Sequence, residues 1–180
     1  MSSYIDSILS EIGPLAENVS EAELGALADE ILGANQIFLA GAGRSGLMIR
    51  AFANRLMHLG LKASVVGDVT CPHTKPGDLL IVGSGSGETS SLVDIARRAS
   101  KSGVRVALVT ASPSSTLARM ANAVLTIPAQ AKGASEKSIQ PMASSFEQVC
   151  MLVYDALVLL LMKRTGETGE TMYARHADLE

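Results

Sequence analysis

Short apolar runs alternate with longer amphipathic stretches along most of this chain. Near-continuous apolar runs are typical of strands buried on both faces, whereas apolar residues at every third or fourth position indicate helices. The runs predict strands at residues 37–40, 63–66, 79–82, 104–109 and 124–127. The amphipathic stretches predict helices at residues 4–17, 20–32, 45–59, 90–102, 116–121 and 145–163.

Strands that alternate with helices at this spacing form right-handed βαβ units, which build a parallel sheet covered by helices on both faces. We therefore expect an α/β fold with a five-stranded parallel sheet in the flavodoxin-like order 2-1-3-4-5. The 180 residues suit a single domain. Its parts are N-terminal helices at 1–34, a core sheet at 35–128, a long C-terminal helix at 143–164 and a polar tail at 165–180.

The third predicted strand runs directly into the segment GSGSGET at residues 83–89, after which a helix begins. Its glycines let backbone N–H groups turn toward a ligand, and Ser84, Ser86 and Thr89 add hydroxyl donors at the positive end of the helix dipole. This arrangement predicts a phosphate site. Because the loop has no lysine, a phosphate monoester fits better than ATP. A turn capped by serine and threonine is the purely structural alternative.

The segment GAGRSG at residues 41–46 follows the first strand in the same way. In the expected order, strands 1 and 3 are neighbours, so the two glycine loops should share one crevice. Gly43, Arg44 and Ser45 are then candidates to contact the phosphate or the sugar, although Arg44 fits a solvated loop residue equally well. The glycine spacing also matches a dinucleotide fingerprint with Asp68 as the ribose-binding acid. Against that alternative, the chain leaves no room for a separate substrate domain.

Both loops and the strand pattern resemble the sugar isomerase (SIS) domain, whose members bind phosphosugars. The chain is also similar to the 6-phospho-3-hexuloisomerase family, through RAFANRLMHLG at 50–60, GDVT at 67–70, QPM at 140–142, SFE at 145–147 and RHADLE at 175–180. The resemblance implies interconversion of D-arabino-hex-3-ulose 6-phosphate and fructose 6-phosphate, in the ribulose monophosphate route of formaldehyde fixation. It also implies a homotetramer with sites at subunit boundaries. Another phosphosugar isomerase and a non-catalytic phosphosugar-binding module stay as alternatives.

Moving a carbonyl to the adjacent carbon requires a base that transfers a proton through an enediolate, and donors for the developing negative oxygen. The resemblance makes Glu147 the base, although Ser144-x-x-Glu147 also matches a capping box at the start of the long helix. It makes His58 a ring-opening or proton-transfer partner that can serve an adjacent subunit. A lone histidine on an apolar helix face is, however, more often a buried hydrogen-bonded residue. His73 and His176 are weaker candidates.

The composition of the chain argues against several classes of partner and cofactor. A formal net charge of −3, three tyrosines and three phenylalanines give little basis for binding nucleic acid. The longest apolar run, at 156–162, is too short to span a membrane, and no signal peptide is recognisable, so we expect a cytoplasmic protein. Cys71 and Cys150 lack metal-ligand spacing, so we expect neither a metal nor another cofactor. A hydrophobic content of 47% and the apolar helix at 145–163 predict a homo-oligomer.

Overall fold

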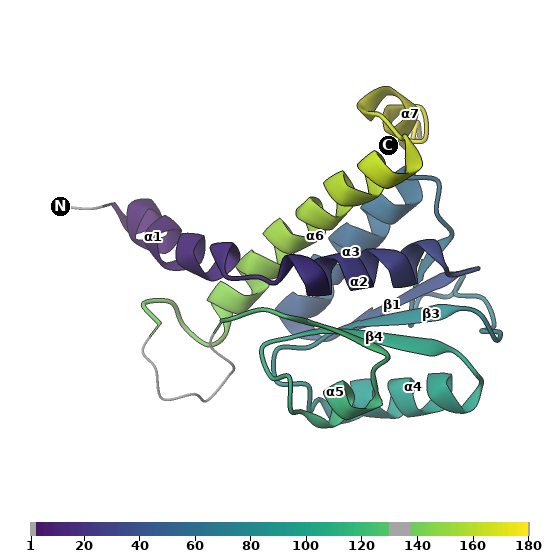
Figure 1. The fold of residues 1–180 in the computed structure, drawn as a ribbon, viewed down its shortest axis with the longest axis horizontal. Coiled ribbons are helices and arrows are strands. Elements are labelled where there is room, and N and C mark those ends of the chain that lie inside the picture. The colour runs from purple at the N-terminus through teal and green to yellow at the C-terminus, as the bar shows by residue number, and fades with distance from the viewer. Residues whose placement is uncertain (1–2, 130–137, 180) are drawn as a thin grey trace.

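The computed structural model describes residues 3–129 and 138–179, and Figure 1 shows their arrangement. Parallel strands form one sheet in the order β2-β1-β3-β4-β5. The strands are β1 (Ile37–Gly41), β2 (Ala63–Val65), β3 (Leu79–Gly83), β4 (Arg105–Thr110) and β5 (Ala123–Thr126). The predicted α/β class and strand order are therefore confirmed, and each predicted helix and strand begins and ends within two residues of its predicted bounds.

Helices cover both faces of the sheet (Figure 1). On one face lie α2 (Glu21–Leu32), α3 (Gly43–His58) and α6 (Ser144–Thr165), and on the other lie α4 (Ser90–Lys101) and α5 (Thr116–Met120). Successive strand residues point to opposite faces, so Leu39 and Ile81 join the larger core under α3 and α6, whereas Phe38 and Leu80 join the smaller core over α4. This two-sided burial explains why the strands read as continuous apolar runs.

Two helices lie outside this layered core. The first, α1 (Tyr4–Glu17), packs against α6, has no buried residue and projects beyond the sheet (Figure 1). The second, α7 (Gly169–Tyr173), lies within the polar tail at 165–180, for which no helix was predicted. Because α7 has only five residues and no apolar period, it depends on local contacts: the Thr168 and Thr171 side chains form a capping box at its start.

Candidate active site

The register of the central strands brings the two glycine loops together. Gly41 at the end of β1 is paired with Gly83 at the end of β3, so the loops that follow these strands lie side by side. They border a pocket of about 360 Å³, whose remaining wall comes from residues 142–147 at the start of α6. The shared crevice predicted from the strand order is therefore present, at the carboxyl ends of the strands where open α/β sheets bind ligands.

Close contact between strand and helix explains the glycines of the first loop. A Cβ atom on Gly41 would lie 2.9 Å from the Gly46 Cα, and one on Gly46 would lie 2.9 Å from the Gly41 carbonyl oxygen. Both glycines thus permit β1 to approach the first turn of α3. Asp68, the candidate ribose-binding acid, instead pairs with Arg50 at 2.9 Å and is not part of the pocket wall. These contacts argue against the dinucleotide alternative.

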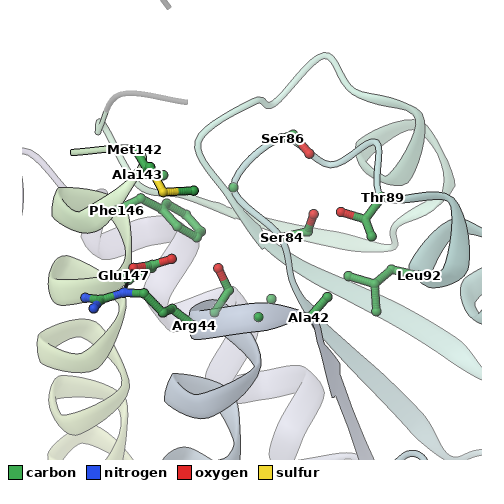
Figure 2. A pocket seen from close by; sticks show the side chains of 14 residues that line it. Ala42, Arg44, Ser84, Ser86, Thr89, Leu92, Met142, Ala143, Phe146 and Glu147 are labelled. Atoms are coloured by element: carbon green, nitrogen blue, oxygen red, sulfur yellow. Dashed lines mark hydrogen bonds and ion pairs between the residues drawn. The ribbon is translucent and has the colours of Figure 1, made fainter. Parts of the chain in front are cut away.

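The serine side chains of the second loop shape its backbone. The Ser84 hydroxyl is buried and accepts a hydrogen bond from the Gly87 N–H at 3.1 Å, and the Ser86 hydroxyl accepts one from the Glu88 N–H at 3.2 Å. In each case the oxygen accepts from the backbone, so the hydroxyl hydrogen is available to donate to a ligand. Thr89 is the N-cap of α4, yet its side chain makes no capping bond and instead lines the pocket. Figure 2 shows these three hydroxyls around one hollow.

An acidic residue within this loop, Glu88, does not line the pocket. Its carboxylate accepts a hydrogen bond at 2.7 Å from the backbone N–H of Thr116, at the start of α5. That hydrogen bond lowers the pKa of Glu88, so the carboxylate stays ionised while it fastens the loop to α5. The negative charge of Glu88 therefore serves the structure of the loop and leaves the hydroxyl and N–H donors to the pocket.

Glu147 faces the pocket from the first turn of α6. Its carboxylate forms an ion pair with the Arg44 Nε of the first glycine loop, and its side chain is only 12% exposed against 61% for Arg44. The N-cap residue of α6 is Ala143, which makes no side-chain cap, and Ser144 instead donates its hydroxyl hydrogen to the Pro141 carbonyl at 2.9 Å. The capping-box alternative for Glu147 is therefore wrong. Figure 2 shows Glu147 and Phe146 opposite the serine-rich loop.

Two aromatic rings support the glycine loops from the side of α6. Phe146 lies 3.2 Å from where a Cβ on Gly85 would be, and the Tyr154 hydroxyl lies 3.1 Å from the corresponding position on Gly83. Burial raises the pKa of Tyr154 and, beside it, that of the Cys150 thiol, so both stay protonated at neutral pH. Neither ring was predicted to belong to the site from the sequence. The glycines themselves were the sequence signal for such a contact, because a residue without a side chain leaves room for a large side chain from another element.

The pocket is lined by the predicted site residues Gly43, Arg44, Ser45, Ser84, Ser86, Thr89 and Glu147, but not by His58 or by the weaker candidates His73 and His176. His58 is the last residue of α3, at the opposite end of the helix from the glycine loop, and is 4% exposed. Its ring stacks on His176 with 5.3 Å between centroids. Within this chain, His58 is therefore remote from Glu147, and its service to an adjacent subunit stays a prediction. His73 is exposed and also lies outside the pocket wall.

The model of the SIS domain family matches residues 30–168. The chain belongs to the SIS domain family. Its relatives include the 3-hexulose-6-phosphate isomerase of Bacillus subtilis, 46% identical over 98% of this chain and 97% of the relative. A 3-hexulose-6-phosphate isomerase of Mycobacterium gastri is 43% identical over 96% of this chain and 88% of that protein.

Among solved SIS-fold structures, a protein of Methanococcus jannaschii superposes with a TM-score of 0.85 at 30% identity, covering 98% of both chains. Its structure was taken to indicate a 3-hexulose-6-phosphate isomerase. Within the described residues of our chain, no three histidine, cysteine or acidic side chains gather in a way that could hold a metal ion. The polar groups that line this SIS domain pocket are hydroxyls, backbone N–H groups, Arg44 and Glu147.

Proposed function

We propose that the protein interconverts D-arabino-hex-3-ulose 6-phosphate and fructose 6-phosphate. The observation that carries the proposal is the position of Glu147, a carboxylate that shares one pocket with an anion-binding loop. A binding module needs the loop alone, whereas an isomerase also needs a base beside the sugar carbons. Names carried by the relatives support this choice of substrate.

The phosphate is held by Ser84, Ser86 and Thr89 together with backbone N–H groups at the start of α4. Hydroxyl and N–H donors at a helix N-terminus suit a phosphate dianion because both the hydrogen bonds and the dipole favour negative charge. This end of the substrate bears no reacting bond. Its binding therefore fixes the sugar chain relative to the opposite wall of the pocket, where the carboxylate lies.

Glu147 acts as the base in the proposed reaction. The carboxylate removes the proton from C2 of the hexulose, the electron pair forms the C2–C3 double bond, and the C3 carbonyl oxygen becomes the enediolate oxygen. The same proton, or one from solvent, then returns to C3, while the C2 hydroxyl passes its proton to the C3 oxyanion, which leaves a carbonyl at C2 and a hydroxyl at C3. Arg44 uses Nε for Glu147 and has its terminal N–H groups to stabilise the developing negative oxygen.

The proposed function also includes a cellular compartment and an oligomeric state. The protein acts in the cytoplasm as a homotetramer, with a phosphorylated hexulose as its partner and with neither nucleic acid nor a membrane. Its reaction belongs to the ribulose monophosphate route of formaldehyde fixation. No metal or other cofactor takes part, because an enediolate can be stabilised by protein donors alone. Dialysis against EDTA should leave turnover unchanged.

The test is to incubate the purified protein with fructose 6-phosphate in deuterated water and to follow the sugar by NMR. We expect the hex-3-ulose phosphate to appear and the C3 hydrogen of fructose 6-phosphate to exchange. Formation of an aldose phosphate instead would assign the protein to another phosphosugar isomerase. Binding without exchange at any carbon would make it a non-catalytic phosphosugar-binding module.

A further inference from the structure

The segment that precedes α6 forms one wall of the pocket in a conformation that needs support. Met142 and Ala143 both line the pocket. Met142 has a φ angle of 62°, and no other non-glycine residue in the described part of the chain has a positive φ angle. Such a backbone conformation is uncommon for a side chain of this size and persists only where surrounding contacts hold it. The contacts around residues 138–142 therefore bear on the shape of the site.

Gln140, two residues before Met142, has its amide group between two helices. The Nε2 group donates to the Glu11 Oε2 of α1 at 3.2 Å and to the Gln148 Oε1 of α6 at 2.9 Å. The other carboxylate oxygen of Glu11 accepts the hydroxyl hydrogen of Ser138. We call Glu11, Ser138, Gln140 and Gln148 the α1–α6 clasp. All four side chains are half-buried, and hydrogen bonds to an ionised carboxylate are stronger than those between neutral groups.

The clasp gives α1 a role that its packing alone does not explain. This helix buries none of its residues, and Tyr4, Ile5 and Leu9 are exposed. The SIS domain match begins at residue 30, so Glu11 lies outside the part of the chain common to the family. On the other side, Gln148 directly follows Glu147 on α6. The clasp therefore connects an element outside the SIS domain both to the pocket wall and to the turn that carries the base.

We propose that Glu11 and Gln140 are positioning residues for the isomerisation: α1 acts through them to hold the wall formed by Met142 and Ala143 against the bound sugar. The inference rests on the proposed function. Loss of either side chain releases the wall while the phosphate loop, on the opposite side of the pocket, keeps its own hydrogen bonds. Small misplacements of a substrate-positioning wall can lower rates by up to about a hundredfold.

The experiment compares Glu11→Ala, Gln140→Ala and the double variant with the parent. We expect each single variant to lower kcat/KM for fructose 6-phosphate by at least about fivefold. The double variant should lose little more than either single one, because both changes break the same clasp. Competitive inhibition by inorganic phosphate should change less than about twofold, since it reports the intact phosphate loop. Glu11→Gln, which keeps one carbonyl oxygen as acceptor, should recover part of the loss.

The matched control is Glu17→Ala, on the same helix. Glu17 is exposed and has no side-chain hydrogen bond or ion pair among the described residues. We expect the control to keep the parental kcat/KM. Variants of Glu11 and Gln140 with parental kcat/KM, strictly additive losses, or a parallel loss of phosphate inhibition would each overturn the inference. If Glu11→Ala does not fold, Gln140→Ala and Glu11→Gln carry the same comparison.

Hydrogen–deuterium exchange separates failure of this inference from failure of the proposed function. Backbone amides of residues 138–144 should exchange faster in Glu11→Ala than in the parent or in Glu17→Ala. A parent protein with no isomerase activity would remove the proposed function but leave this measurement valid for the clasp. Unchanged exchange in an active enzyme would remove the clasp and leave the proposed function standing.

Discussion

Glu147 and Arg44 are 103 residues apart in the chain and form the ion pair that borders the site. In the sequence, Glu147 fits a capping box and a catalytic carboxylate equally well, because a capping box requires only Ser144 three residues earlier. Two contacts decide between them: Ser144 turns back to Pro141, and Glu147 turns to the first glycine loop. Neither contact follows from local spacing.

The catalytic proposal for Glu147 predicts a specific effect of Glu147→Gln. An amide keeps the size of the side chain but cannot accept a proton, so we expect turnover to fall at least about a hundredfold. The free energy of unfolding should change by no more than about 1 kcal/mol, because the partner Arg44 is largely solvated. Exchange of the fructose 6-phosphate C3 hydrogen in deuterated water is the measurement.

The control is Asp155→Asn, on the exposed side of the same helix, which should exchange at the parental rate. Near-parental exchange in Glu147→Gln would show that the base lies elsewhere. His58 of an adjacent subunit would then be the next residue to test.

The connection from β3 to α4 requires a glycine at its most crowded position. Gly87 has φ of 64°, and a Cβ on it would lie 2.0 Å from the Ser115 Oγ and 2.4 Å from the Ser115 Cβ. Its N–H also donates to Ser84. The loop therefore cannot accept a side chain here without moving away from α5, and that movement would separate the donors that we propose to hold the phosphate.

Gly87→Ala should accordingly weaken fructose 6-phosphate binding at least about tenfold, measured by titration calorimetry. The control is Gly166→Ala, at the end of α6, where φ is 75° and no atom lies within 4 Å of the added Cβ. That variant should lose about 1–2 kcal/mol of stability from the left-handed conformation alone and keep the parental affinity. Equal affinities of Gly87→Ala and the parent would contradict the assignment of this loop as the phosphate site.

The C-terminal segment is docked by an ion pair that makes its attachment dependent on pH. Arg175 donates to both carboxylate oxygens of Glu167, at 2.8 and 2.9 Å, and also to the His58 carbonyl at 2.9 Å. Hydrogen bonds from Arg175, and then from Thr171, lower the pKa of Glu167 from its usual 4.5 to about 2. Since folding lowers this pKa, the stabilisation is complete above about pH 4.5 and is lost as the pH falls toward 2.

We therefore expect the free energy of unfolding of Glu167→Gln to be lower than that of the parent, by an amount that is constant between about pH 6 and 8. The difference should shrink below about pH 4.5 and vanish near pH 2. Denaturant titrations at several pH values measure it. Glu170→Gln, on α7 but without a side-chain partner among the described residues, should show no such dependence. A difference that is independent of pH would mean that the ion pair does not dock this segment.

For the whole molecule, the distribution of apolar surface is the feature that points beyond one chain. By length and composition α6 could cross a membrane, but 50% of its most apolar stretch is buried inside the protein, where it contributes to the larger core between α6, α3 and the sheet. Leu152 and Leu159 remain exposed on its outer side. Apolar surface of this kind on a core helix is typical of subunit contacts.

We predict that the protein is a homotetramer at micromolar concentration, measured by light scattering. Leu152→Asp combined with Leu159→Asp should give a smaller species, because two charges would be buried without partners in the interface. Val69→Asp, at a fully exposed position beside the β2 edge of the sheet, should keep the parental mass. A monomeric parent with full activity would contradict both the assembly and the shared site.

Local pattern was sufficient for the strands, their order and the meeting of the two glycine loops. Each strand is buried on both sides, so its apolar run is continuous in sequence, and parallel connectivity leaves few possible orders. Gly83 and Gly41 are therefore neighbours because each ends a strand whose position in the sheet can be predicted from the local sequence pattern. The same holds for Ser84 and Ser86, whose hydroxyls are placed by the loop that contains them.

Only the tertiary structure decided which distant groups meet. The partner of Glu147 lies in the first glycine loop, the Tyr154 hydroxyl of α6 lies beside Gly83, and Gln140 contacts Glu11, which is 129 residues away in the sequence. His58, by contrast, is carried away from the pocket by the length of α3. The physical reason is common to all four. A periodic pattern specifies which face of an element is buried, whereas the choice of a polar partner depends on how whole elements pack, and no residue encodes that by itself.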